Sequence, residues 1–357
     1  MDWNEWNNQI PPLDKAAADA SKRRWNSLAK PLGSLGLLED AVVKIAALTG
    51  KADFTLVKRA VVVMCADNGV VAKGVTQTGM DVTASVAKNI ARRRGCISRF
   101  AFAAHADVFP VDIGVAADLS GANLLDRKVA WGTKDLSEGP AMTREQAEQA
   151  LQIGIDVVAD LKKKGYQVIA TGEMGIGNTT TSSAIASVLL QRPAEEMTGR
   201  GAGLSDQGMK RKIEMIRQAL EINRPNSDDA LDVLTKVGGF DIAGMAGVFL
   251  GGALYRVPVL IDGFISSVAA LVAARLCPNA RCAMLATHCS DEPAAALILD
   301  ALGLRPLIFA GMRLGEGTGA VSALPLFDLA LEVYHNMDTF DDLAIESYQP
   351  LGGETSC

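Results

Sequence analysis

This chain of 357 residues has few aromatic side chains, few histidines and no close pair of cysteines. Phenylalanine, tryptophan and tyrosine make up only 5% of it, so alanine, valine, leucine and isoleucine must fill most of the core. The three histidines lack the spacing of a zinc site, and we expect no metal. The six cysteines form no C-x-x-C pair, which favours mostly buried, reduced thiols in a cytoplasmic protein.

The chain also lacks an uninterrupted hydrophobic run of membrane-spanning length. Its most apolar stretch, residues 240–277, is interrupted by Asp241, Arg256, Pro258 and Asp262. These interruptions leave segments shorter than the roughly 20 residues that a span requires. The formal net charge is −6, and the basic residues do not gather into one patch. We therefore expect neither a membrane nor a nucleic acid as a partner.

Apolar strand-like runs alternate with helical stretches along most of the chain. We expect strands at 60–66, 107–114, 168–170, 257–261, 281–286 and 307–310. This alternation predicts an α/β fold with a doubly wound, mostly parallel, Rossmann-like sheet. We expect residues 56–324 to form this large domain. The helical segments 1–55 and 325–357 are expected to form a small helical domain, with a loose tail at 350–357.

One glycine-rich loop, residues 312–320, carries a single carboxylate, Glu316. It follows the expected strand, and ligands of open α/β sheets bind at the carboxyl ends of the strands. A lone glutamate in such a turn is more often a solvated side chain. Because a second, similar loop occurs elsewhere in the chain, we favour the interpretation of Glu316 as a general base over that of a solvated side chain. Its apolar neighbour Leu314 is expected to line the substrate site.

That second loop, residues 171–181, lies between an apolar strand and the helix at 182–190. Its polar and glycine positions are Glu173, Gly175, Gly177, Asn178 and Thr179. A strand, a glycine-rich turn and a helix start together present free N–H groups to a phosphate. The loop has neither G-x-G-x-x-G nor G-x-x-x-x-G-K-[ST], and a polar cap of a core helix explains it about as well.

A third glycine-rich turn, residues 199–206, is also able to face an anion. It contains Gly201 and Gly203 and precedes the expected helix at 210–223, which carries Lys212. By itself a helical lysine is usually solvated, with its ammonium group in water.

Seven motifs in unbroken order give the chain a family resemblance. They are Lys30-Pro31-x-Gly-Ser-Leu-Gly and the segments 62–69, 172–180, 223–226, 236–241, 262–264 and 312–320. The chain resembles the nicotinate-nucleotide:dimethylbenzimidazole phosphoribosyltransferase family, which activates the lower ligand in cobamide synthesis. The resemblance implies a Rossmann-like sheet, a small helical domain and a dimer. It also implies transfer of 5-phosphoribosyl from nicotinate mononucleotide to an aromatic acceptor.

The resemblance also suggests a role for each candidate residue. Glu316 resembles the catalytic base, and Glu173 is placed to stabilise or orient the ribose. The remaining matches are the donor loop Gly175, Gly177, Asn178 and Thr179, the ribose and phosphate positions Gly201, Gly203 and Lys212, and the donor contact Ser290. The pyridinium of the donor is already a good leaving group, so we expect neither a general acid, a magnesium ion nor any cofactor.

Two departures from the family pattern fall on the acceptor side. Asn68 stands where the family has histidine, and residues 84–86 are small or apolar where benzimidazole-using members have a glutamine. These departures leave fewer polar groups to bind a ring nitrogen of the acceptor, which predicts use of phenol or p-cresol as well as benzimidazoles. We expect the protein to act as a homodimer or as a heterodimer with a paralogous subunit. A non-catalytic partner subunit is the rival, and retention of Glu316 argues against it. A dinucleotide-dependent oxidoreductase would require the missing G-x-G-x-x-G.

Overall fold

The computed structural model describes residues 2–349, so the tail expected at 350–357 lies outside it. The chain divides into a large unit, 57–323 with the segment that ends at Pro11, and a small unit made of 12–56 and the chain from Leu324 onward. We expected the N-terminal segment in the small unit. Instead, helix α1 (Trp3–Gln9) belongs to the large one, because the backbone and side-chain N–H groups of Asn279 donate to Asn7 at 2.9 and 3.0 Å.

Six parallel strands form the sheet of the large unit, in the order β3-β2-β1-β4-β5-β6. They are β1 (Arg59–Ala66), β2 (Ala106–Gly114), β3 (Leu125–Asp126), β4 (Val168–Met174), β5 (Val259–Ile261) and β6 (Met284–Ala286). The predicted doubly wound α/β fold is confirmed. Strand order reverses where β4 pairs with β1, and the crevice beyond the carboxyl ends at such a point is where these folds bind ligands.

The apolar run at 307–310 does not form the buried strand that we expected. Ile308 makes only an isolated parallel bridge to His288, and Phe309 is 77% exposed. The neighbouring strand β6 ends at Ala286, so the run has no strand to pair with beyond that bridge. The loop that carries Glu316 therefore follows an irregular, exposed segment.

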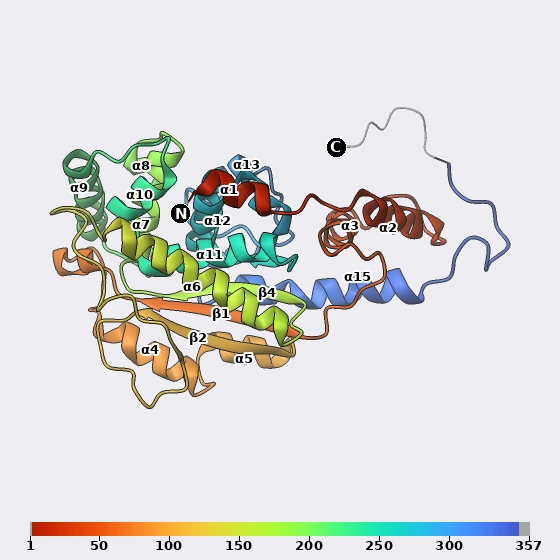
Figure 1. Ribbon diagram of the computed structural model, residues 1–357, viewed down its shortest axis with the longest axis horizontal. Helices are drawn as coiled ribbons and strands as arrows, with labels where there is room; N and C mark the ends of the chain where they lie inside the picture. The colour runs from red at the N-terminus through yellow and green to blue at the C-terminus, as the bar shows by residue number, and fades with distance from the viewer. Residues whose placement is uncertain (1, 350–357) are drawn as a thin grey trace. The chain divides into compact units, whose positions relative to one another are not determined.

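Helices cover both faces of the sheet (Figure 1). On one side lie α4 (Asp81–Ala91) and α5 (Cys96–Ala103), with the short α14 (Thr318–Ser322) against α5 and β4. On the other side, α11 (Phe240–Leu254) packs on the strands, and α6 (Arg144–Lys163) packs on α11. Because α11 lies between these layers, all of its residues up to Ala253 are buried.

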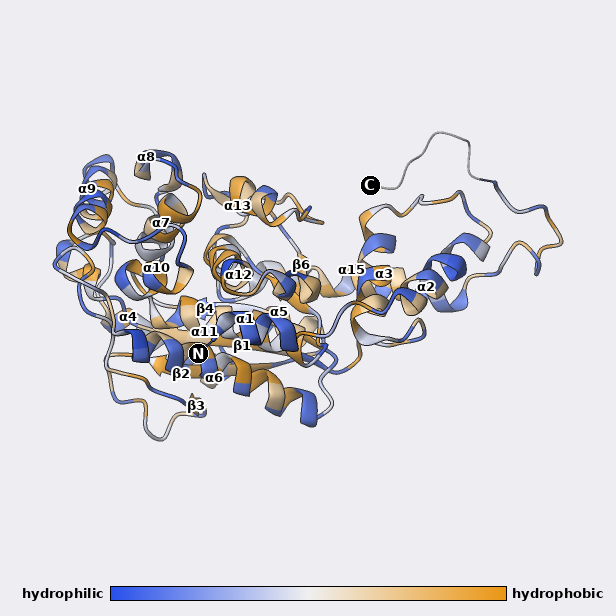
Figure 2. Cartoon of the chain, turned by 45° about the horizontal axis from the view of Figure 1, so that its top comes forward, coloured by the Kyte–Doolittle hydropathy of each residue, from blue (hydrophilic) through white to orange (hydrophobic). Residues whose placement is uncertain are grey.

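The remaining helices of the large unit surround the carboxyl ends of the strands or cover β5 and β6. They are η1 (Gly69–Lys73), α7 (Asn178–Leu189), α8 (Ala194–Met197), α9 (Asp206–Asn223), α10 (Ala230–Val237), α12 (Phe264–Leu276), η2 (Pro278–Ala283) and α13 (Ala295–Leu302). Helix α9 shows both hydrophilic and hydrophobic stretches (Figure 2). It buries Lys212, Ile216, Ala219 and Asn223, which recur every three or four residues and so share one face.

The small unit is helical and combines segments from both ends of the chain: α2 (Lys15–Ser27), α3 (Leu37–Thr49) and α15 (Leu324–Asn336). The rings of Trp25 and Tyr334 pack with their centroids 5.0 Å apart. The buried Lys30 ammonium lies 2.6 Å from a carboxylate oxygen of Glu39 and 5.1 Å from the Trp25 ring centre. One motif residue of the resemblance, Lys30, thus links two helices of this core.

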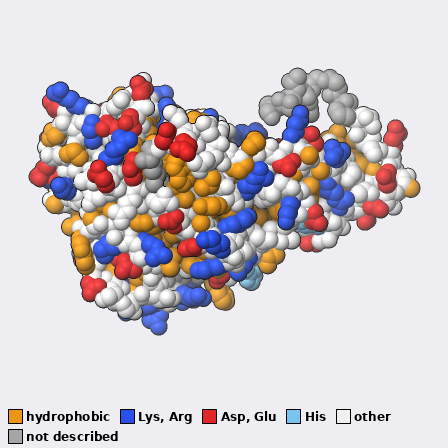
Figure 3. Space-filling model, in the orientation of Figure 1, with side chains coloured by type: hydrophobic (Ala, Val, Ile, Leu, Met, Phe, Trp, Pro, Cys, Tyr) orange, Lys and Arg blue, Asp and Glu red, His pale blue; other side chains and the backbone are white. Residues whose placement is uncertain are grey.

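Within residues 2–349, no helix combines the length and apolar character that crossing a bilayer demands. On the molecular face seen in Figure 3, basic and acidic side chains are interspersed.

Candidate active site

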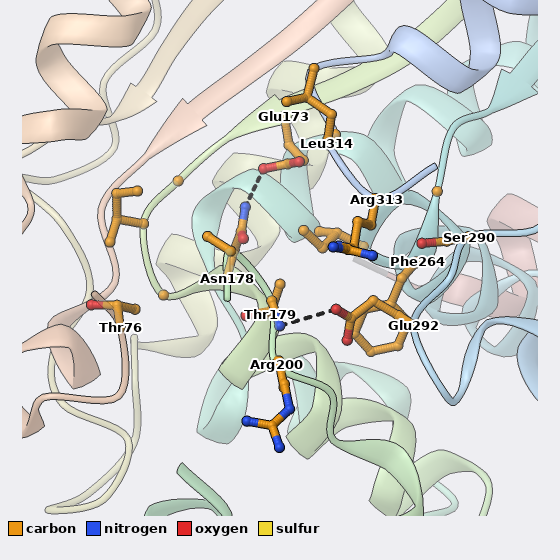
Figure 4. Close-up of a pocket in the computed structure, with 18 of the residues that line it drawn as sticks. Thr76, Glu173, Asn178, Thr179, Arg200, Phe264, Ser290, Glu292, Arg313 and Leu314 are labelled. Atoms are coloured by element: carbon orange, nitrogen blue, oxygen red, sulfur yellow. Dashed lines mark hydrogen bonds between the residues drawn. The ribbon is translucent and has the colours of Figure 1, made fainter. Parts of the chain in front are cut away.

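A cavity of about 170 Å³ lies at the carboxyl ends of the strands in the large unit (Figure 4). Loops that follow β4, β5 and β6 line it, together with the glycine-rich turn before α9 and the Glu316 loop. The predicted site residues that it brings together are Glu173, Gly175, Gly177, Asn178, Thr179, Gly201, Gly203, Lys212, Ser290, Leu314 and Glu316. Residues far apart in the sequence therefore share one cavity.

Asn68 is the predicted site residue that does not line this cavity. Its side chain is fully buried, and its amide donates to the carbonyl oxygen of Ile176 at 3.3 Å. Asn68 thus supports the glycine-rich loop at 171–181 from the protein interior, because it follows β1, directly beside β4. Residues 84–86 of α4 do not line the cavity either. In this structure, the two acceptor-side departures therefore lie away from the cavity wall.

Glu316 is half-buried at the cavity wall and has an unusual backbone conformation, with φ of 60°. Its Oε2 accepts the N–H of Ile97 at 3.0 Å, in the first turn of α5. Its Oε1 takes part in no hydrogen bond with the residues that the structure describes. Leu314 also lines the cavity and is 57% exposed. The glutamate thus presents one open oxygen to a ligand.

Glu173, at the end of β4, belongs to a buried network with Asn178 and Asp241. The Asn178 amide donates to Glu173 Oε2 and, at 3.0 Å, to Asp241 Oδ2. Burial, with the nearby Asp241 charge, raises the pKa of Glu173 to about 8, and burial raises the pKa of Asp241 to about 6. At neutral pH the proton of this network therefore resides mainly on Glu173, which becomes a hydrogen-bond donor.

Lys212 is fully buried, although a helical lysine is usually solvated. Its ammonium donates to Thr179 Oγ1 at 2.9 Å and to the Gly199 carbonyl at 3.0 Å. Burial lowers the pKa of Lys212 to about 8, opposed by the charge of Glu292. Beside it begins α7, whose N-cap Gly177 has φ of 93° and provides no side-chain cap. A buried cation next to uncapped helical N–H groups is suited to a phosphate.

Two acidic residues that line the cavity, Asp262 and Glu292, were not among the predicted site residues. Asp262 follows β5 and accepts the N–H groups of Gly317 and Ala320. Glu292 accepts the N–H of Gly201 at 3.1 Å through Oε1, while its buried Oε2 has no partner among the described residues. A signal existed for Asp262, which directly follows an apolar strand. Glu292 lies two residues after the predicted residue Ser290. Its contact with Gly201 joins segments that are far apart in the sequence, so no local pattern indicated it.

The cavity thus combines three chemical environments. An accessible carboxylate oxygen of Glu316 is able to take a proton. The buried Lys212 ammonium and the start of α7 are able to hold an anion. Phe264 and Leu314 add apolar surface between polar groups (Figure 4). This set suits a ligand with an anionic group at one end and an aromatic ring near the base.

Comparisons with known proteins agree with this arrangement. A family model described as phosphoribosyltransferase matches residues 10–345. A nicotinate-nucleotide–dimethylbenzimidazole phosphoribosyltransferase from Acetivibrio thermocellus is 49% identical, over 96% of this chain and 97% of the relative. The protein of the same name from Chloroflexus aggregans is 48% identical, over 95% and 96%. The crystal structure of CobT from Thermus thermophilus superimposes with a TM-score of 0.88 at 39% identity, covering 93% of this chain and 99% of that one.

The similarity extends through the small unit, the sheet and all the loops that line the cavity, which lie within the matched residues. It confirms the resemblance inferred from the seven sequence motifs. The chain belongs to the family of nicotinate-nucleotide–dimethylbenzimidazole phosphoribosyltransferases.

Proposed function

We propose that this protein transfers 5-phosphoribosyl from nicotinate mononucleotide to an aromatic lower-ligand base, either a benzimidazole or a phenol such as p-cresol. The product is the α-riboside phosphate used in cobamide synthesis. The observation that carries the proposal is the open carboxylate oxygen of Glu316 in the same cavity as the buried Lys212 ammonium. The names of the relatives support the same donor and a benzimidazole acceptor.

In the proposed reaction, Lys212 and the start of α7 hold the donor phosphate. The bond between C1′ of the ribose and the pyridinium nitrogen breaks, and its electron pair stays on that nitrogen as neutral-ring nicotinate departs. The acceptor nitrogen or oxygen bonds to C1′, and its proton passes to Glu316 Oε1. Glu173 holds a proton at neutral pH, so we assign it to orienting the ribose by donating a hydrogen bond.

Both acceptor classes lose a single proton, so Glu316 is able to serve either. The sequence argument for phenol rested on Asn68 and residues 84–86, none of which lines the cavity. What supports a broad acceptor range is the apolar surface that Phe264 and Leu314 contribute to the cavity that Glu316 also lines. Use of phenol or p-cresol therefore stays a prediction.

The rival role is a non-catalytic partner subunit in a heteromeric enzyme. Such a subunit has no need of an oriented carboxylate in the cavity, so the bond from Ile97 to Glu316 favours catalysis by this chain. The expected homodimer, or heterodimer with a paralogous subunit, also stays a prediction. Light scattering on the purified protein, alone and with a paralogue, tests it.

Glu316→Gln tests the proposed base. We expect turnover with nicotinate mononucleotide and dimethylbenzimidazole to fall roughly 100- to 10,000-fold, because an amide does not accept the acceptor proton. Donor affinity, measured by calorimetry, should stay near that of the unmodified protein. Glu214→Gln, on the exposed face of α9, is the matched control and should leave turnover unchanged. Normal turnover by the Glu316 variant would show that another group takes the proton.

Competition between acceptors tests the breadth of the site. The protein is incubated with nicotinate mononucleotide and equal amounts of phenol and dimethylbenzimidazole, and the ribosides are identified by mass. We expect both products, each abolished in the Glu316 variant. Absence of phenolic riboside even when phenol is the only acceptor would restrict the enzyme to nitrogenous bases.

A further inference from the structure

The loop that presents Glu316 has a left-handed backbone conformation, which is unfavourable for the glutamate itself. Gly315, Glu316 and Gly317 have φ angles of 86°, 60° and 98°. Glycine adopts this left-handed region readily, but a residue with a Cβ does so at an energetic cost. The conformation at Glu316 therefore has to be held in place by contacts from outside the loop.

Asp262 supplies the principal contacts. It follows β5 and is only 3% exposed. Its Oδ2 accepts the N–H of Gly317 at 3.1 Å, and its Oδ1 accepts the N–H of Ala320 at 3.0 Å. These N–H groups belong to the start of α14, where Gly317 is the N-cap and provides no side-chain cap. One carboxylate from a different strand thus fixes the residue that directly follows Glu316.

Two other elements complete the support of this loop. Gly172 of β4 lies so close that a Cβ added there would be 2.3 Å from the carbonyl oxygen of Glu316. Ile97 of α5 holds Oε2 of the glutamate. Contacts from Gly172 of β4 and from Asp262 after β5 therefore fix the loop backbone. Ile97 of α5 fixes one oxygen of the Glu316 carboxylate. These constraints leave Oε1 without a hydrogen bond to the described residues, in a side chain that lines the cavity.

We propose that Asp262 is a positioning residue for transfer: it holds the Glu316 loop so that Oε1 meets the acceptor proton. Both of its oxygens are engaged by backbone N–H groups, so Asp262 orients the base and does not itself take the acceptor proton. This inference rests on the proposed function, in which Glu316 is the base. It adds a specific requirement, namely that the carboxylate of Asp262 is needed for turnover and not for holding the donor.

Asp262→Asn tests this requirement with little change in side-chain volume. The amide keeps one accepting oxygen and turns an NH₂ group toward the second N–H, which loosens the loop. We expect kcat to fall roughly 10- to 100-fold, since misplacing a catalytic group by about 1 Å costs that much. The KM and the calorimetric affinity for nicotinate mononucleotide should change less than about twofold.

A double-mutant cycle separates positioning from a merely structural role. If Asp262 acts only by positioning Glu316, its substitution has no further effect once the Glu316 carboxylate is gone. The double variant Glu316→Gln with Asp262→Asn should therefore turn over no more slowly than Glu316→Gln alone. Asp262→Ser, which retains a single accepting oxygen, repeats the cycle if the asparagine variant does not fold. Asp229→Asn is the control, because Asp229 also accepts two helical N–H groups, at 3.0 and 3.1 Å, but at the start of α10. It should leave kcat unchanged.

Each outcome distinguishes the two proposals. If Glu316→Gln retains turnover, the proposed base is wrong. If Glu316→Gln is inactive but the folded Asp262 variant keeps normal kcat, the proposed function stands and the role of Asp262 is overturned. Rate losses that multiply in the double variant would likewise overturn it, because they would show that Asp262 acts independently of Glu316.

Discussion

The first turn of α5, which donates a hydrogen bond to Glu316, also carries an exposed thiol. Cys96 is the first residue of that helix, and the next N–H, of Ile97, binds the glutamate. Partial burial raises the pKa of Cys96, and the negative charge of Glu316 raises it further. The reactivity of the thiol therefore reports on the charge of Glu316, the proposed base.

We expect Glu316→Gln to make Cys96 react faster with iodoacetamide near neutral pH. Loss of the carboxylate charge lowers the pKa of Cys96, and only the thiolate is nucleophilic. Peptide mass spectrometry over time measures the rate. Cys289 is the internal control, because burial and Asp300, rather than Glu316, raise its pKa. Equal Cys96 rates in the two proteins would show that the charge of Glu316 does not reach the thiol.

Individual residues were predictable from sequence where a local pattern fixes their place. Glu316 and Asn178 lie in or beside glycine-rich turns, and both turns line the cavity, although only the turn at Asn178 follows a strand. Asn68 also follows a strand, yet it is buried under the loop at 171–181, because β4 pairs directly beside β1. Lys212 shares a helical face with Ile216 and Ala219, but its complete burial also depends on α7 and the turn at Gly199, which no local pattern brings beside it.

At the scale of elements, α6 and α11 touch backbone to backbone. A Cβ built on Gly154 of α6 would lie 2.1 Å from the carbonyl oxygen of Gly244. One built on Gly247 of α11 would lie 2.0 Å from the carbonyl oxygen of Leu151. Glycine at these positions lets α11 pack between the sheet and α6.

Gly247→Ala should therefore destabilise the protein by roughly 1–3 kcal/mol, the usual cost of inserting a methyl group into a packed contact. Urea unfolding followed by circular dichroism measures the change. Gly139→Ala is the matched control, because a Cβ there meets no atom within 4 Å and its φ is not in the left-handed range. A Gly247 variant as stable as the control would mean that the two helices separate freely.

Elements were predicted well where apolar runs are long and have partners on both sides. Residues 60–66 and 107–114 form β1 and β2 almost as expected. The run at 307–310 has a similar composition, but the short β6 offers it one bridge and no strand beyond. Hydrophobicity predicted a strand there, whereas pairing depends on how far the neighbouring strand extends.

For the whole molecule, the buried acids make stability depend on pH. Burial raises the pKa of Glu173 to about 8 and that of Asp241 to about 6, above their ordinary values near 4 in an unfolded chain. The folded state therefore binds protons more tightly than the unfolded state. The stabilisation is complete below the unfolded pKa values and is lost progressively as the pH rises above them, up to about pH 6 for Asp241 and about pH 8 for Glu173.

We expect the free energy of unfolding to decrease from about pH 5 to about pH 8, and to decrease less in Glu173→Gln, because an amide does not titrate. Urea unfolding at several pH values measures both slopes. Glu214→Gln, with its side chain in solvent, should keep the slope of the unmodified protein. Identical slopes in all three proteins would assign the pH dependence to other groups.

The left-handed backbone at Glu316 also bears on how such a chain evolves. A side chain at this φ raises the free energy of the folded state by roughly 1–2 kcal/mol, and glycine would relieve it. A paralogue that is no longer selected for phosphoribosyl transfer would therefore fold more stably with glycine in place of this glutamate. Selection for folding stability then favours loss of the strained residue, so a paralogue that has become a non-catalytic subunit is expected to lose it, whereas an active enzyme keeps it.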